Sequence, residues 1–271
     1  MSRESTSAGF AYAAAIPVAV SLALVSLGGL LLPDAYAREQ PAWTAQAVGQ
    51  DWFDLVVAAP WIAWCGLRAR SGSGRWRILL AGGYAYAVYE MLIYAFAVHF
   101  NALFLLYCAT LGLAGYALAA IAIDLSAHTI TVERRRARQA GAFLVLVGVA
   151  FGAMWLAEDL PAALRGEPAA SLAETGLLTN PVHVIDYAFV LPAHVIAGVL
   201  LWRQRRAGAL FGAVVLAFGV LMAASIGGMM LVIRLSGDPA PVAVIAAMFA
   251  VAAATATLLV RLRVPSDMLR A

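Results

Sequence analysis

The chain has 271 residues, of which 63% are hydrophobic and 12% are charged, with a formal net charge of +3. Globular proteins carry roughly 45–50% apolar and about 25% charged residues, so this chain has too few charges to cover a soluble surface. The composition excludes a soluble enzyme, a nucleic-acid-binding module and a disordered tail. It predicts a polytopic helical membrane protein that is embedded in a lipid bilayer. All 18 Lys and Arg positions are Arg, so no lysine is present to form a retinal Schiff base.

A helix needs about 20 apolar residues to cross the hydrocarbon core of a bilayer. Eight stretches of the sequence meet or approach that length: 10–32, 52–67, 78–98, 102–123, 141–157, 183–202, 209–233 and 241–260. The third and fourth stretches are separated only by His99, Phe100 and Asn101, which predicts a tight helical hairpin. We expect an all-α fold of about eight transmembrane helices in one domain, residues 1–271. The first stretch is longer than a signal-peptide core of roughly 7–15 residues, so we expect it to be retained.

The arginines predict the orientation of the chain, because cytoplasmic loops of membrane proteins carry an excess of Arg and Lys. With the N-terminus inside, the cytoplasmic segments hold Arg3, Arg68, Arg70, Arg75, Arg77, Arg134, Arg135, Arg136, Arg138, Arg203, Arg205, Arg206, Arg261, Arg263 and Arg270. Only Arg38, Arg165 and Arg234 fall elsewhere. Both termini are therefore expected in the cytoplasm, with segments 33–50 and 158–182 outside. An excess of Ala, Arg and Gly is typical of a GC-rich bacterial genome, which favours a bacterial plasma membrane.

Two stretches share a pattern that favours an internal repeat. Asp54, Pro60 and Gly66 in the second stretch have the same spacing as Asp186, Pro192 and Gly198 in the sixth. Both stretches run inward, and four stretches precede and four follow the midpoint. The pattern predicts a parallel 4+4 duplication, with halves 1–132 and 133–271. Parallel repeats of this kind occur in transporters.

Glu90 is the acidic residue expected deepest in the membrane. It lies about 20 Å along its helix from Arg77, at 1.5 Å per residue. An ionisable side chain at such depth is costly and by default indicates function. Tyr86, Tyr89, Tyr94 and Tyr107 lie on or near the same helix and could hydrogen-bond its carboxyl. A protonated Glu90 that only joins two helices is the alternative interpretation.

Further polar candidates gather near the expected outer side. Asp51 and Asp54, and likewise His183 and Asp186, are three residues apart on one helical face. Asp51 is also typical of a helix cap, as is Asn180 before a proline. We predict catalytic or proton-handling roles for Glu90, Asp54, Asp186 and His183. The predicted ligand-binding residues are Asp51, Tyr89, Tyr94, His99, Asn101, Trp155 and Asn180.

Cofactors stay open at this point. A divalent metal could bind to His183, Asp186, Asp51 and Asp54, with His99 and Glu90 as further ligands, although no recognised metal-binding spacing supports this. A bis-histidine haem is the less favoured alternative.

We expect an acidic and histidine-containing pocket, open to the extracytoplasmic side, that binds or translocates a small solute or cation. One alternative is an intramembrane enzyme acting on a lipid or isoprenoid, with Glu90 as general acid and Trp155, Tyr89 and Tyr94 as apolar walls. A second alternative is a non-catalytic subunit of a membrane complex. The sequence indicates no oligomeric state.

Overall fold

The computed structural model describes residues 9–263, and within them every regular element is helical. The helices and π-helical segments are α2 (Ala15–Leu31), α3 (Pro41–Phe53), η1 (Asp54–Ala58), α4 (Ala59–Ala69), α5 (Gly74–Ala97), α6 (Phe104–Ser126), α7 (Arg134–Arg165), α8 (Ala170–Thr175), α9 (Pro181–Ile185), η2 (Asp186–Val190), α10 (Leu191–Trp202), α11 (Gly208–Leu235) and α12 (Val242–Arg261). The all-α fold is confirmed. Arg3 and Arg270, which entered the orientation argument, lie outside the described residues.

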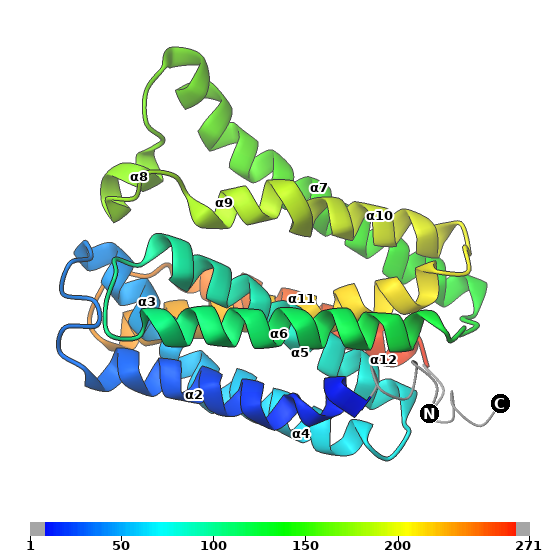
Figure 1. The fold of residues 1–271 in the computed structure, drawn as a ribbon. Helices are drawn as coiled ribbons and strands as arrows, with labels where there is room; N and C mark the ends of the chain where they lie inside the picture. The colour runs from blue at the N-terminus through cyan, green and yellow to red at the C-terminus, as the bar shows by residue number, and fades with distance from the viewer. Residues whose placement is uncertain (1–8, 264–271) are drawn as a thin grey trace.

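Seven helices of the described chain are long and apolar enough to cross a membrane. They are Gly9–Leu31, α5, α6, α7, the continuous helix Pro181–Trp202, α11 and α12. A multi-pass membrane protein is therefore supported. The expected second span, 52–67, is not among the seven, so an eighth span stays a prediction. It lies within α3, η1 and α4, which follow one another without a break from one end of the bundle to the other (Figure 1).

The segments expected to be long loops are partly helical. Residues 41–50 belong to α3, which has Pro41 in its first turn, where the missing backbone N–H costs nothing. Helix α7 continues past the expected end at residue 157 to Arg165. Both extensions are more polar than the spans they prolong. A prediction from hydropathy alone therefore starts the first of these helices too late and ends the second too early.

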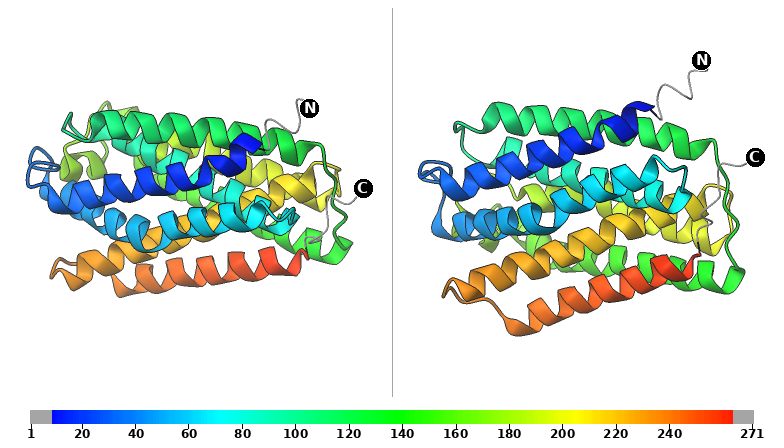
Figure 2. Two further views of the ribbon diagram at one scale, coloured as in Figure 1. Left: turned by 60° about the horizontal axis from the view of Figure 1, so that its bottom comes forward. Right: turned by 90° about the horizontal axis from the view of Figure 1, so that it is seen from below.

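The helices alternate in direction, so their connections gather at two ends of the bundle (Figures 1 and 2). The end that carries residues 70–73, 127–133 and 203–207 is called the arginine end below. There Arg77 forms an ion pair with Asp124 at 3.0 Å, and Tyr12 donates a hydrogen bond to the same carboxylate at 2.6 Å. The opposite end carries residues 32–40, 98–103, 166–180 and 236–241. Apart from Arg38, Arg165 and Arg234, the described arginines thus lie at or near one end, as the sequence indicates, and the assignment of that end to the cytoplasm stays a prediction.

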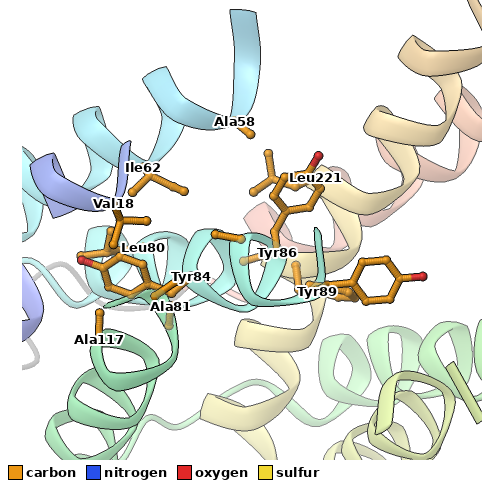
Figure 3. Close-up of a cluster of buried hydrophobic side chains, with 14 of the residues drawn as sticks. Val18, Ala58, Ile62, Leu80, Ala81, Tyr84, Tyr86, Tyr89, Ala117 and Leu221 are labelled. Carbon is orange, nitrogen blue, oxygen red and sulfur yellow. The ribbon is translucent and has the colours of Figure 1, made fainter. Parts of the chain in front are cut away.

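Helix α5 lies at the centre of the bundle, where it packs against α4, α6 and α11. Of its span, 72% is buried, against 56% for α11, the next most buried. Toward the arginine end its neighbours form a close-packed apolar core that includes Val18, Ile62, Leu80 and Ala117 (Figure 3). The polar side chains in the second half of α5, Tyr86, Tyr89, Glu90 and Tyr94, are all buried.

Helices α7 and α10 form a close pair on one side of the bundle (Figure 1). A Cβ atom added to Gly141 would lie 2.6 Å from the carbonyl oxygen of Gly198, and one added to Gly198 would lie 2.6 Å from that of Gly141. Only glycine allows two backbones to approach this closely. Helix α11 joins this pair to the rest, since it packs against α10 as well as α3, α5 and α12.

The two stretches with the shared sequence pattern also share a local distortion. η1 begins at Asp54 and η2 at Asp186, and each is a five-residue π-helical segment. The N–H of Ala59 donates to the carbonyl of Asp54, and the N–H of Leu191 donates to that of Asp186. A proline follows each segment and would press on the carbonyl four residues earlier in a regular helix. The wider π turn relieves this contact. The predicted 4+4 duplication gains local support but remains a prediction.

Candidate functional site

Asp51 lies inside the bundle and accepts hydrogen bonds from two tyrosines. Its side chain is 0% exposed. Tyr36 donates to Oδ2 at 2.7 Å, and Tyr94 donates to Oδ1 at 3.0 Å. Because α3 begins at Pro41, Asp51 is in the interior of a helix and caps nothing, so the capping interpretation is wrong for this residue. Asn180 is a cap, since its Oδ1 accepts from the N–H groups of Val182 and His183 at 3.0 and 3.3 Å.

Tyr36 approaches Asp51 from the connection between α2 and α3. Burial raises the pKa of the Tyr36 phenol well above its usual value, and the neighbouring carboxylate of Asp51 raises it further. The phenol therefore stays protonated and donates a hydrogen bond to Asp51.

Asp54 starts η1, one helical turn from Asp51, and is 1% exposed. Its Oδ1 accepts from Tyr86 at 2.6 Å and from Gln50 Nε2 at 3.0 Å, and Gln50 Nε2 also contacts the Tyr86 hydroxyl. Its Oδ2 is buried without a hydrogen-bond partner in the described chain. A buried oxygen with no donor is unfavourable unless it binds a proton or a cation.

Glu90 is 4% exposed and projects from the central helix α5. The acidic groups that repel its charge are Asp54 and Asp51. The nearby tyrosines do not bind Glu90 as expected. Tyr86 donates to Asp54, Tyr94 to Asp51 and Tyr89 to Asp186. Figure 3 shows Tyr86 and Tyr89 leaving α5 in different directions. We call Asp51, Asp54 and Glu90 the acid cluster.

A second polar group surrounds Asp186 at the start of η2. Trp155 Nε1 donates to Oδ2 of Asp186 at 2.9 Å, and the Tyr89 hydroxyl donates to Oδ1 at 3.3 Å. The Trp155 ring lies against the His183 ring, with centroids 4.2 Å apart. His183 Nδ1 is 2.8 Å from Asp159 Oδ2, which also accepts from Tyr187 at 3.0 Å. The predicted residues Asp186, His183, Trp155 and Tyr89 are thus brought together.

The expected binding residues His99 and Asn101 make no hydrogen bond to the acids of either polar group. His99 Nδ1 is 3.0 Å from Glu39 Oε1, and the His99 side chain is 57% exposed. Asn101 Nδ2 donates to the carbonyl of Ala35 at 2.8 Å and to the Tyr107 hydroxyl at 3.2 Å. These contacts hold two connections together at the end of the bundle opposite the arginines.

The mixed-ligand metal shell predicted from the sequence is not assembled. Within residues 9–263, no group of three or more His, Cys, Asp or Glu side chains has the arrangement of a metal site. Asp51 and Asp54 lie with Glu90, whereas Asp186 and His183 belong to the separate group around Trp155.

Sequence reasoning missed the roles of Tyr36, Gln50, Asp159 and Tyr187. Gln50 precedes Asp54 by one helical turn, a spacing that places both on one face. Asp159 has the same relation to Trp155. Both signals were hidden because residues 41–50 and 158–165 were expected to be loops.

Two cavities adjoin the Asp186 group. The larger, of about 690 Å³, lies between α5, α6, η2–α10 and α11, and its wall is almost entirely apolar. The smaller, of about 80 Å³, is lined by Asp186, Trp155, Thr255 and other residues. Both cavities are lined by Tyr89, Val190, His194 and Phe218. Glu90 lines neither of them.

Comparison with known proteins adds nothing to this geometry. No protein-family model, no curated protein and no solved structure gives a significant match to the chain. The function has to be argued from the site itself.

Proposed function

We propose that this membrane protein binds a proton in the acid cluster, Asp51, Asp54 and Glu90, with a monovalent cation held by only two of these carboxylates as the alternative. The observation that carries the proposal is that no Arg or His side chain within residues 9–263 forms a salt bridge with any of these three acids. The acids paired with an arginine there are Asp124, Glu133 and Glu167, while Glu39 and Asp159 contact histidines. Burying unpaired carboxylates is costly, so a protein that keeps three of them together gains from binding positive charge.

The hydrogen bonds around the cluster support ligand binding over a purely structural role. Asp51 has a donor on each carboxylate oxygen, as an ionised group requires. Asp54 has two donors on Oδ1 and none on Oδ2. A cation or a shared proton between Asp54 and Glu90 would satisfy the free oxygen. Acids that only joined helices would have their hydrogen-bonding groups satisfied within the fold.

The position of the cluster supports binding from one side over passage through the protein. Along their helices, the acids lie farther from the arginine end than the apolar core residues Ile62 and Leu80. If the arginine end is cytoplasmic, as the positive-inside rule predicts, the cluster lies in the extracytoplasmic half. The ligand would then enter near Tyr36 or through the Asp159–His183–Asp186 group and return the same way.

The enzyme alternative has less support. It requires Glu90 to face a cavity that could hold a lipid or isoprenoid substrate, but Glu90 is not among the residues that line the two cavities beside Asp186.

Infrared difference spectroscopy of the protein in nanodiscs tests the proposal. Spectra are recorded at low and high pH, and with and without Na⁺, K⁺ or Ca²⁺, for wild type and the Glu90→Gln and Asp54→Asn variants. We expect a carboxyl band that changes with pH or cation in wild type and is lost in both variants. Glu174→Gln is the matched control, because Glu174 is exposed. If wild type, Glu90→Gln and Asp54→Asn give the same difference spectra, the acid cluster binds neither a proton nor a cation.

A further inference from the structure

The two cavities beside Asp186 together resemble a site for an amphipathic molecule. The larger cavity, about 690 Å³, is within the range of roughly 300–1,000 Å³ typical of ligand pockets. No Asp, Glu or Arg is among the residues that line it. Phe189, which is 67% exposed, and Phe211 lie on its rim. Phe189 belongs to the membrane-spanning helix Pro181–Trp202 and Phe211 to α11, so this rim lies on the part of the surface that would face lipid.

The side-chain donors Trp155, Tyr89 and Thr255, which line one or both cavities, already donate hydrogen bonds within the protein. Trp155 Nε1 and the Tyr89 hydroxyl both donate to Asp186. The Thr255 hydroxyl is bonded to the carbonyl of Val251 at 2.7 Å. His194 Nδ1 is 2.8 Å from the carbonyl of Val190, and because a carbonyl only accepts, Nδ1 must carry the hydrogen.

In the neutral imidazole, His194 Nε2 is then a hydrogen-bond acceptor, and no group within residues 9–263 donates a hydrogen bond to it. Every donor named above already makes a hydrogen bond, whereas His194 Nε2 and further lone pairs on Asp186 can still accept one. A molecule whose polar group lies here must therefore bring a hydrogen to donate. A hydroxyl fits this requirement, whereas an ether or a ketone does not.

Depth and volume exclude a phospholipid headgroup from the junction of the two cavities. His194 lies about 20 Å along its helix from Pro181, at 1.5 Å per residue, which is near the middle of a hydrocarbon core of about 30 Å. No arginine lines either cavity to pair with a phosphate. The smaller cavity holds about 80 Å³. A water molecule occupies about 30 Å³ of liquid, so a hydroxyl-bearing end fits there and a glycerophosphate does not.

We infer that this site binds a neutral long-chain lipid alcohol, with the hydroxyl donating to His194 Nε2 and the hydrocarbon chain in the larger cavity. An ammonium head would also donate, but it would bring three hydrogens and a charge to the centre of the bilayer, where a charge is costly. One hydroxyl matches the one ring nitrogen that lacks a partner. The inference is independent of the acid cluster, because none of Asp51, Asp54 and Glu90 lines either cavity.

Saturable binding of radiolabelled geranylgeraniol to the purified full-length protein tests this inference, with the methyl ether and the amine of the same chain as competitors. We expect the alcohol to bind at least about tenfold more tightly than the ether, a difference of about 1.4 kcal/mol. His194→Leu should remove this preference while leaving weak binding of both. Equal binding of alcohol and ether to wild type, or a preference that survives in His194→Leu, would overturn the inference. Tighter binding of the amine would assign a cationic ligand instead and would also overturn it.

A pair of substitutions on α6 tests the cavity itself without changing buried residues. Ala122 is exposed and lines the larger cavity, so Ala122→Trp should fill it and lower alcohol binding at least tenfold. Ala119 is exposed on the same helix and does not line the cavity, so Ala119→Trp should bind like wild type. If both variants bind the alcohol like wild type, or both lose it equally, the alcohol does not occupy this cavity.

Discussion

Tyr89 and Glu90 are consecutive residues on α5, yet they face different polar groups. The Tyr89 hydroxyl donates to Asp186, which starts η2, while the Glu90 carboxyl lies with Asp54, which starts η1. Adjacent residues on a helix point about 100° apart, so two neighbouring positions on the central helix face the two polar groups.

Two substitutions of Glu90 distinguish the effect of its charge on stability from the effect of its side-chain volume. Glu90→Gln should leave the melting temperature within a few degrees of wild type, because the amide keeps the volume and remains polar. Glu90→Leu should raise the melting temperature, since it removes a buried carboxyl that has no cationic partner in the described chain. Thermal unfolding in detergent measures both. A strong destabilisation by Leu would mean that Glu90 makes an essential structural contact.

Gly29 is predicted to be indispensable for the position of Asp51. A Cβ atom at residue 29 would overlap Oδ2 of Asp51 and the hydroxyl of Tyr36. Gly29→Ala should therefore displace this hydrogen-bonded pair and cost about 1–3 kcal/mol, as overpacking of a core does. Gly115→Ala is the control, because nothing lies within 4 Å of its added Cβ. That change should be neutral or slightly stabilising, since alanine favours helix by about 0.5–1 kcal/mol over glycine. Equal unfolding free energies for the two variants would contradict the packing described at Gly29.

Some features of the fold and site could be predicted from sequence for clear physical reasons. Glu90, Asp54 and Asp186 stand out because an acid inside a long apolar run has few structural explanations. The shared spacing of Asp54–Pro60 and Asp186–Pro192 pointed to two equivalent distortions, which are η1 and η2. In these cases the local sequence carries the energetic reason for the structure.

Other features depended on partners that are distant in sequence. Tyr86 and Tyr94 were assigned to Glu90 because they share its helix, but their hydroxyls bind the aspartates of the neighbouring helix. The side of α5 on which each tyrosine lies depends on how α5 packs against α4, α6 and α11. Likewise, Asp159 meets His183 only because α7 extends beyond its apolar portion. Neither arrangement can be recognised from the sequence of a single helix.

The hydrogen bond between Trp155 and Asp186 should stabilise the α7–η2 contact. Trp155→Phe keeps an aromatic ring beside His183 but removes the donor to Oδ2 of Asp186. Hydrogen bonds to charged groups contribute about 1.5–3 kcal/mol, so we expect a loss of that order in unfolding free energy. Trp52→Phe is the matched control, since Trp52 is 46% exposed and makes no side-chain hydrogen bond within the described chain. A double-mutant cycle with Asp186→Asn should give a coupling energy above about 0.5 kcal/mol, and additive losses would show that the two side chains do not interact.

The orientation of the bundle can be tested by cysteine labelling in intact bacterial cells. Cys65 and Cys108 are first replaced by alanine, because both are free thiols. Ala170→Cys at the end opposite the arginines should react with a membrane-impermeant maleimide in intact cells. Thr131→Cys at the arginine end should react only after lysis. The reverse pattern would place the arginine end outside, contrary to the positive-inside rule, and the acid cluster in the cytoplasmic half.

The π-helical segments should relieve the contact between each proline and the carbonyl of the preceding turn. Deleting the exposed residue Val56 would convert η1 into regular α-helix, in which four residues turn about as far as the five residues of the π segment. It would also press Pro60 against the carbonyl four residues earlier, which costs about 3 kcal/mol. We therefore expect the deletion to destabilise the protein by at least that amount. Deleting the exposed Phe189 from η2 should act in the same way through Pro192 and Asp186. Val56→Ala and Phe189→Ala are the controls, since they shorten a side chain and leave the register unchanged. If the deletions cost no more than these substitutions, the π segments are tolerated irregularities, and their matching positions carry no weight for the predicted repeat.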